Sequence, residues 1–361
     1  MRILGIESSC DETAAAVVED GRTILSNIIA SQFDLHRPFG GVVPEVAARA
    51  HAERITAVVD EALSVAGCGR DSIDAISVVN RPGLVGALLV GIAAAKALSI
   101  AWEKPLINID HIHGHVYSSM LAGFVRFPHI ALIVSGGHTC LYKVESPLDI
   151  VPIGQTADDA AGEAFDKVAK MLDLGFPGGP ALSKLAAGAP PEGCALFKGV
   201  GLHTAPGNLG LGENTQPSLD FSFSGLKTAV YYHLRGTSRG RGPLRSISDI
   251  ERASVAASFQ EAACEIMASK ALLACKRYRI GALAIGGGVA CNRRLREILL
   301  RPREEGKQTG TPEEPEVFFP PPVLCTDNAA MTAGLAFHYV GRQGYAEGLE
   351  IDADPTPKRA Q

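Results

Sequence analysis

Two histidines with helical spacing, His111 and His115, are the residues that most directly suggest chemistry. Residues four apart share one face of an α-helix, so the two imidazoles can bind one transition-metal ion. A zinc protease of the H-E-x-x-H type places a glutamate after the first histidine as general base, but Ile112 stands there in this chain. The pattern therefore predicts a metal that holds or polarises a substrate. A surface pair or a core contact between two histidines is the alternative.

Composition and charge limit the class of protein. The chain has 361 residues, of which 46% are hydrophobic and 20% charged, which is typical of a folded protein with a sizeable core. A net charge of −5 argues against a surface coated in basic charge for non-specific nucleic-acid binding. Arginine-rich stretches at residues 235–245, 276–279 and 293–303 leave a local basic patch open, with a solvated face as the alternative.

The cysteines and apolar runs indicate the compartment. The eight cysteines form no C-x-x-C pair, and the N-terminus does not read as a signal peptide. The most apolar stretch, residues 84–101, is interrupted by Gly86 and Gly91 and contains Lys96. We therefore expect a cytoplasmic protein with no membrane span.

Two parts of the chain follow the same pattern of hairpin, strand, helix and strand. Strands are expected at residues 3–6, 14–18, 23–29, 75–79 and 106–109, and again at 130–134, 140–144, 282–285 and 317–319. Helices are expected from residue 86 to about 100, from His111 onward, and at 292–300 and 329–339. The repetition indicates an internal duplication, while ordinary α/β alternation is the simpler explanation.

The duplication predicts a geometry. His111 and Asp327 each stand where a strand ends and a helix begins, one in each repeat. Ligands of open α/β sheets collect at the carboxyl ends of strands, so two facing lobes would aim His111, His115 and Asp327 into one cleft. Three protein ligands leave coordination positions open for a substrate.

The remaining segments complete the predicted organisation. An amphipathic helix is expected at 160–172, a rigid turn at 176–180 and a loose surface segment at 186–218. We predict lobe I from residues 1–127 plus 326–347, lobe II from residues 128–325, and a tail at 348–361.

Eight segments, in order, resemble one known family. They are GIESSCDET at 5–13, GGVVPE at 40–45, HIHGH at 111–115, VSGGHT at 134–139, DDAAGEAFDK at 158–167, FSFSGLK at 221–227, GGV at 287–289 with Asn292, and CTDN at 325–328. Together they resemble the TsaD family of tRNA N6-adenosine threonylcarbamoyltransferases over roughly residues 1–345.

The resemblance implies an α/β fold of the actin-like, Hsp70-ATPase-like (ASKHA) class, with two duplicated lobes around a central nucleotide cleft. It implies transfer of the threonylcarbamoyl group of L-threonylcarbamoyl-adenylate to N6 of the adenosine beside the anticodon of tRNAs that read ANN codons. One divalent metal is expected, Fe²⁺ first and Zn²⁺ as the alternative. Expected partners are tRNA, a non-catalytic TsaB-like paralogue and a TsaE-like P-loop ATPase.

The resemblance also assigns residues. His111, His115 and Asp327 match the metal ligands. Residues matching the contacts to the acyl-adenylate are Val134, Ser135, Gly136, Gly137, His138, Asp166, Gly179 and Asn292. Asp11 and Glu12 are the candidates for proton handling, because their loop would face the cleft; a turn cap is the alternative for both. Asn292 by itself also fits a helix cap.

Three positions depart from or add to the family pattern. Arg81 stands in a turn where relatives usually have glycine, and Ser183 stands where they often have aspartate. His113 lies two residues from each predicted ligand, on another face of the helix, so we do not expect it to bind the metal.

Other functions fit parts of the sequence. An actin-fold kinase or ATPase would use Mg²⁺ between carboxylates and phosphates and has no need of two imidazoles. A metalloprotease, an activity once attached to the family, needs the glutamate that Ile112 replaces. A non-catalytic scaffold, like the family's shorter paralogue, would lack the histidine pair.

Overall fold

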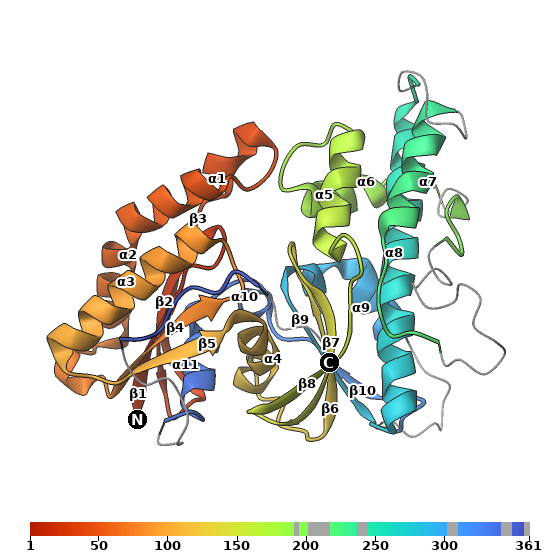
Figure 1. The fold of residues 1–361 in the computed structure, drawn as a ribbon. Helices are drawn as coiled ribbons and strands as arrows, with labels where there is room; N and C mark the ends of the chain where they lie inside the picture. Colours follow the sequence, from red (N-terminus) through yellow and green to blue (C-terminus); the bar gives the residue numbers. More distant parts are fainter. Residues whose placement is uncertain (191–194, 201–216, 237–244, 302–309, 341–348, 357–361) are drawn as a thin grey trace.

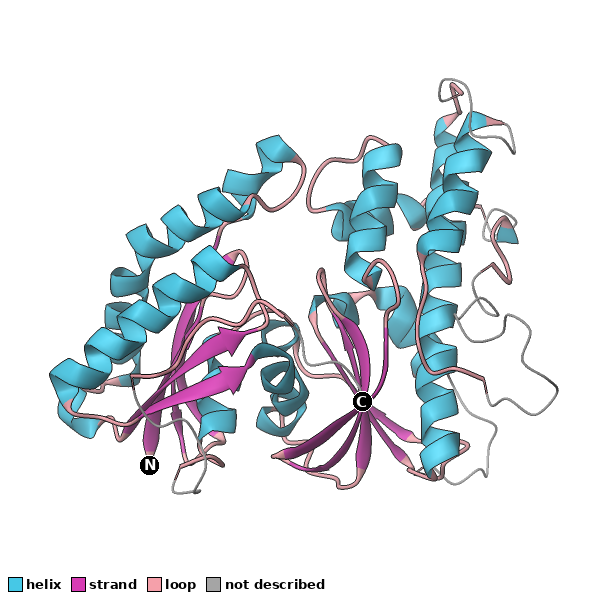
Figure 2. Cartoon of the chain, viewed as in Figure 1, coloured by secondary structure: helices cyan, strands magenta, loops and turns pink. Residues whose placement is uncertain are grey.

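The fold consists of two five-stranded sheets, each covered by helices (Figures 1 and 2). The computed structural model describes residues 1–190, 195–200, 217–236, 245–301, 310–340 and 349–356. One helix, α4 (His111–Leu121), lies between the two sheets and contacts strands of both (Figure 1).

The first sheet has the strand order β3-β2-β1-β4-β5. Its strands are β1 (Arg2–Glu7), β2 (Glu12–Glu19), β3 (Thr23–Ser31), β4 (Ala75–Arg81) and β5 (Leu106–Asp110). The first three form an antiparallel meander, whereas β4 and β5 continue parallel to β1. β1 and β4 are almost entirely buried, as expected for central strands with apolar residues on both faces.

The second sheet repeats this topology with the order β10-β9-β6-β7-β8. Its strands are β6 (His129–Val134), β7 (Thr139–Ser146), β8 (Asp149–Gln155), β9 (Ala282–Gly286) and β10 (Glu316–Phe318). A meander is again followed by two parallel strands. The predicted duplication is therefore present as a shared topology. The sequence did not predict β8, which is the counterpart of β3.

Helices of the first half surround the first sheet. They are α1 (Phe33–His36), α2 (Pro44–Ala66) and α3 (Val85–Trp102), with 3-10 turns η1 (Arg37–Phe39) and η2 (Arg70–Ser72). No element had been predicted for residues 44–66, although α2 is the longest helix in this half. α3 has the length and mean hydropathy, 1.8, of a membrane-crossing helix. It packs against β4 and α2, and a core helix has the same length and composition.

Helices of the second half surround the second sheet, except the last one. They are α5 (Ala161–Met171), α6 (Gly178–Ala186), α7 (Ser224–Arg235), α8 (Asp249–Tyr278), η4 (Gly288–Cys291), α9 (Arg293–Leu299) and α10 (Pro322–Cys325). α6 begins inside the expected turn at 176–180. Of the segment expected to be loose, residues 191–194 and 201–216 lie outside the described residues.

The final helix, α11 (Ala329–Ala336), packs on the first sheet although it follows the second in sequence. Gly5 in β1 permits the contact, because a Cβ there would lie 2.4 Å from the Ala329 carbonyl oxygen and 2.8 Å from the Ala333 nitrogen. The chain thus returns to its first sheet at its end. The residue limits given above for the two lobes remain a prediction.

We expect Gly5→Ala to reduce the free energy of unfolding by roughly 3 kcal/mol, because a methyl group would press on the backbone of α11. Gly69→Ala is the matched control, since Gly69 has a φ of −95° and no atom near its Cβ position. Urea unfolding followed by circular dichroism measures both. Equal unfolding free energies for the two variants would contradict the close packing of β1 on α11.

Candidate functional site

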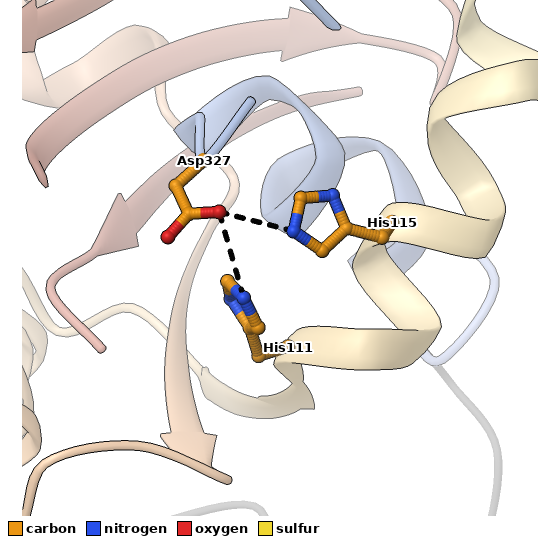
Figure 3. A group of neighbouring side chains, drawn as sticks. All are labelled: His111, His115 and Asp327. Atoms are coloured by element: carbon orange, nitrogen blue, oxygen red, sulfur yellow. Dashed lines mark hydrogen bonds and ion pairs between the residues drawn. The ribbon is translucent and has the colours of Figure 1, made fainter. Parts of the chain in front are cut away.

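His111, His115 and Asp327 come together although more than 200 residues separate the histidines from the aspartate (Figure 3). One Asp327 oxygen, Oδ1, lies 3.0 Å from His115 Nε2 and 3.6 Å from His111 Nε2. The two imidazole rings meet edge to face, with centroids 4.6 Å apart. Both histidines are buried, whereas the Asp327 side chain keeps 18% of its surface exposed. The cluster is therefore open to solvent on the carboxylate side.

The start of α4 fixes the two histidines. Asp110 caps this helix, because its Oδ1 accepts hydrogen bonds from the backbone N–H groups of Ile112 and His113. Arg81 pairs with the other oxygen of the same carboxylate, at 3.2 Å from Nε to Oδ2. Arg81, which departs from the family pattern, thus supports the cap of the histidine helix.

A buried carboxylate, that of Glu7, orients the His111 ring through the nitrogen that faces away from Asp327. Glu7, at the end of β1 and without exposed surface, lies 2.9 Å from His111 Nδ1 through Oε2. Its other oxygen accepts the N–H of Ser9, whose hydroxyl is 3.2 Å from the same imidazole nitrogen. Burial lowers the pKa of His111, but Glu7 and Asp327 outweigh it and raise the pKa to about 9. Because Nδ1 of His111 faces Glu7, the other ring nitrogen, Nε2, is turned toward Asp327.

The donor set fits a single metal ion. Two imidazole nitrogens and one carboxylate oxygen lie within 4.8 Å of one another, and such a set suits divalent transition metals. A metal-binding histidine usually has a carboxylate on its other nitrogen, which is the position of Glu7. Burial would raise the pKa of Asp327, but His111 and His115 hold it well below its usual range, so the carboxylate is ionised.

The predicted hairpin loop lies next to this cluster. The His138 ring is 6.2 Å from that of His111, and burial together with the two neighbouring histidines lowers the pKa of His138 to about 4. Within the loop, Ser135 N donates to the His138 carbonyl at 2.8 Å. The Ser135 carbonyl accepts the N–H of Gly162 at the start of α5. The loop therefore connects α5 to the group formed by His111, His115 and Asp327.

Two glycines allow the strand ends to approach closely. A Cβ on Gly287, which has a φ of +85°, would lie 2.3 Å from the Val134 carbonyl oxygen. A Cβ on Gly286 would lie 2.9 Å from the carbonyl oxygen of His115. The Gly-Gly pair after β9 thus lets the hairpin strand and the histidine helix approach the same backbone.

Asp166 and Gly179 lie together on the α5–α6 side. Asp166 Oδ1 accepts the N–H of Gly178 at 2.8 Å, at the first turn of α6. Burial raises the pKa of Asp166, while the bonds from Gly178 and Gly179 act against the shift and the Asp11 carboxylate adds to it.

Asn292 caps α9, and both the oxygen and the NH2 group of its side chain already make hydrogen bonds within the protein. Its Oδ1 accepts the N–H groups of Arg294 and Leu295, and its Nδ2 donates to Gln260 Oε1 at 3.0 Å and to Ser183 Oγ at 3.2 Å. Ser183, the second departure from the family pattern, is thus a partner of Asn292. A hollow of about 580 Å³ adjoins this network, between α6, α8 and α9, away from the metal cluster.

Asp11 and Glu12 are both 8% exposed. Burial, followed by the negative charges of Asp327 and Asp11, raises the pKa of Glu12 to about 10. Burial thus favours the protonated form of Glu12, and the Asp327 carboxylate acts in the same direction.

Two residues of the site escaped sequence reasoning, Glu7 and Ser9. Both belong to a segment that was singled out, and a glutamate closing an apolar strand signals a buried charge that needs a partner. That this partner is His111 could not be read from spacing. His113 lies outside the ligand group, with its ring 6.0 Å from that of Tyr142, as expected.

We expect Glu7→Gln to weaken metal binding by about 10- to 100-fold, because an amide stabilises the imidazole ligand less than a carboxylate does. Titration with Co²⁺ against a competing chelator, followed by the visible spectrum, gives the affinity. Glu19→Gln is the control, since Glu19 pairs with Arg2 at the far end of the same hairpin. An unchanged Co²⁺ affinity in Glu7→Gln would show that Glu7 does not act on a metal ligand.

Comparison with solved structures agrees with the fold described above. Among solved structures, full-length HypF (TM-score 0.56, 14% identity, covering 96% of this chain and 47% of that one) is similar. So is component A of the Acidaminococcus fermentans (R)-2-hydroxyglutaryl-CoA dehydratase (TM-score 0.51, 13% identity, covering 95% and 100%). At such identities these likenesses show the fold alone, which is of the actin-like class.

Sequence comparison is more specific. A relative from Moorella thermoacetica is 49% identical over 355 residues, covering 98% of this chain and 96% of its own. One from Anaeromyxobacter sp. (strain Fw109-5) is 47% identical over 363 residues, covering 98% and 99%. Both are tRNA N6-adenosine threonylcarbamoyltransferases, and residues 23–334 match the model of the family with that description. The chain therefore belongs to the TsaD family of tRNA N6-adenosine threonylcarbamoyltransferases.

Proposed function

We propose that this transferase moves the threonylcarbamoyl group of L-threonylcarbamoyl-adenylate to N6 of the adenosine beside the anticodon of tRNAs that read ANN codons. Family membership supports the reaction type. The observation that carries the proposal is the cluster of His111, His115 and Asp327 beside a hairpin loop rich in backbone N–H groups.

His111, His115 and Asp327 would hold one divalent metal ion, with Fe²⁺ first and Zn²⁺ as the alternative. Two histidines and one carboxylate with open positions are a ligand set typical of ferrous iron. When bound, such an ion supplies a Lewis acid that can orient the threonylcarbamoyl group and polarise its carbonyl. Glu7 would keep His111 in the tautomer that leaves Nε2 free to bind.

The protein's own groups would orient the adenylate. Gly136 and Gly137 lie at the tip of the loop and have open space around them, so a phosphate can approach their N–H groups. Asp166 uses Oδ1 for α6, and its second oxygen would accept from a ribose hydroxyl. Asn292 and Gly179 would complete the nucleoside side. Bringing the reactants together in this way supplies a large share of the rate in acyl transfers.

Proton handling is assigned to the loop between β1 and β2. Glu12, whose pKa is raised first by burial, would in its protonated form donate a hydrogen bond to an oxygen that becomes negative during the attack. Asp11 beside it is the candidate to accept the proton that the adenosine amine loses.

We propose the cytoplasm as the site of action, with tRNA as macromolecular substrate. A TsaB-like paralogue and a TsaE-like P-loop ATPase are the proposed protein partners. Of the predicted basic stretches, residues 239 and 241 and the region 302–309 lie outside the described residues, and Arg294 is already paired with Glu261 and Glu297.

We expect His111→Ala to lower transfer of labelled threonine onto tRNA by at least about 10³-fold, because a metal ligand is lost from the reacting centre. The assay contains a threonylcarbamoyl-adenylate-forming enzyme and the two partner proteins, and mass spectrometry measures bound iron and zinc. His113→Ala is the matched control on the same helix and should keep both metal and activity. A His111→Ala protein that lost its metal yet kept full activity would refute the metal's role.

We also expect a chelator to abolish transfer in the wild-type protein without unfolding it, because two sheets and two apolar clusters hold the fold without the metal. Activity should return on adding Fe²⁺ or Zn²⁺, and the ion that restores it identifies the native metal. Circular dichroism before and after chelation shows whether the fold is intact. Unfolding on chelation would instead make the site structural.

A further inference from the structure

The loop between β1 and β2 carries Asp11 and leads into Glu12, the first residue of β2, and it is anchored through its backbone carbonyl groups. The Ser9 carbonyl accepts the N–H of Leu84 at 2.8 Å, and the Asp11 carbonyl accepts the N–H of Gln32 at 2.9 Å. Between them, the Cys10 carbonyl lies 3.0 Å from Nε2 of His51. Three successive carbonyls are thus tied to three different elements, and only the middle one depends on a side chain.

His51 lies two turns into α2 and has no exposed surface. A carbonyl oxygen can only accept, so Nε2 must carry the proton, and Nδ1 must accept from Thr13 Oγ1, 2.7 Å away. Burial lowers the pKa of His51, with the Cys10 carbonyl acting in the opposite direction, which agrees with a neutral ring. His51 therefore connects the two ends of the turn that holds Asp11 and Glu12.

The same hydrogen-bond chain continues to the segment GGVVPE at residues 40–45. Gln32 Nε2 donates to Thr13 Oγ1 at 3.5 Å, and Gln32 Oε1 lies 3.3 Å from His36 Nε2. The backbone N–H of Val43, the cap residue of α2, donates to His36 Nδ1 at 3.3 Å.

The direction of every bond follows from the two ends. A backbone N–H at Val43 can only donate, and the Cys10 carbonyl can only accept. Starting from either end, His36 and His51 must both be Nε2–H tautomers, and the Thr13 hydroxyl must donate to His51. Five hydrogen bonds thus run one way, from the start of α2 to the loop between β1 and β2.

We propose that His51 is a positioning residue for the transfer reaction: by holding the Cys10 carbonyl, it sets the Asp11 and Glu12 carboxyls against the metal cluster. The inference rests on the proposed roles of those two carboxyls. No part of the His51 side chain needs to touch substrate. Without it, the Cys10 carbonyl would lose its side-chain donor, and the loop would relax between its two remaining anchors.

The test compares His51→Ala, His51→Gln and His51→Asn in the transfer assay with partner proteins and tRNA. For His51→Ala we expect kcat to fall on the order of 10²-fold, as for a small displacement of reacting groups, with KM for threonylcarbamoyl-adenylate and bound metal unchanged. His51→Gln, whose amide can still reach the Cys10 carbonyl, should recover most of the lost kcat. His51→Asn, which retains only a partner for Thr13, should recover little.

His129→Ala is the matched control. His129 is also fully buried and also bonds a backbone carbonyl, that of Arg126 at 2.7 Å, but it lies at the start of β6, away from the loop. We expect His129→Ala to lower the thermal stability about as much as His51→Ala does, but to leave kcat unchanged. Full kcat in folded His51→Ala would overturn the proposal, as would equal losses of kcat in His51→Ala and His129→Ala, or no advantage of glutamine over asparagine.

A second readout does not depend on activity. Imidazole ¹⁵N shifts of the wild-type protein should report Nε2–H tautomers for both His36 and His51, and hydrogen exchange at the amides of residues 10–13 should rise in the His51 variants but not in His129→Ala. A different tautomer, or unchanged exchange, overturns the proposal even if the alanine variant folds poorly. If the wild-type protein transfers no threonylcarbamoyl group, the proposed function fails, while the exchange result still decides whether His51 holds the loop.

Discussion

The buried carboxylate of Glu7 is the constraint on which the site depends. A charge without exposed surface is costly unless it is paired, and Glu7 has two partners, the His111 imidazole and the Ser9 backbone N–H. The first bond decides which nitrogen of His111 faces the cleft. The second turns the chain after β1 into the loop that carries Asp11. The Glu7 carboxylate thus positions both His111 and the loop between β1 and β2.

The repeated topology explains how distant residues meet. In each sheet the two parallel strands end on the same side as the central strand, so β5, β9 and the turn after β1 deliver their loops to one region. α4 lies between the sheets, and α11 returns the C-terminal part of the chain to the first sheet, where Asp327 precedes it. Close backbone contacts at Gly5, Gly286 and Gly287 make this packing possible.

Several of the polar groups assigned to substrate binding already support the protein's own helices. Asp166 bonds the first turn of α6, and Asn292 caps α9 while its amide binds Ser183 and Gln260. For Asp166 the two roles are compatible, because a carboxylate can accept further hydrogen bonds beside the one from Gly178. The Asn292 oxygen already accepts two N–H groups and its NH2 already has two acceptors, so a nucleoside contact there would have to replace one of these bonds. Such groups are rigid before a ligand arrives, which lowers the entropy lost on binding.

The sequence by itself determined the class of fold, the order of most strands, the family and the three residues of the metal cluster. Local signals carried these results: apolar runs bounded by glycine and polar turns, histidines at helical spacing, and motifs in a fixed order. It did not predict α2, α7, α8 or β8. α2 has buried apolar residues at helical spacing, such as Ile55, Val59 and Ala62, so its pattern is present in the sequence, whereas β8 is only partly buried and has a weaker strand pattern.

Only the tertiary structure decided which polar side chains are hydrogen-bond partners of one another. Spacing along the chain could not show that Glu7 orients His111, that Arg81 supports the cap of α4, or that His51 reaches the Cys10 carbonyl. Each of these contacts joins residues 29 to 104 positions apart. They arise because buried polar groups must find partners, and which groups are buried together depends on how the helices pack on the sheets.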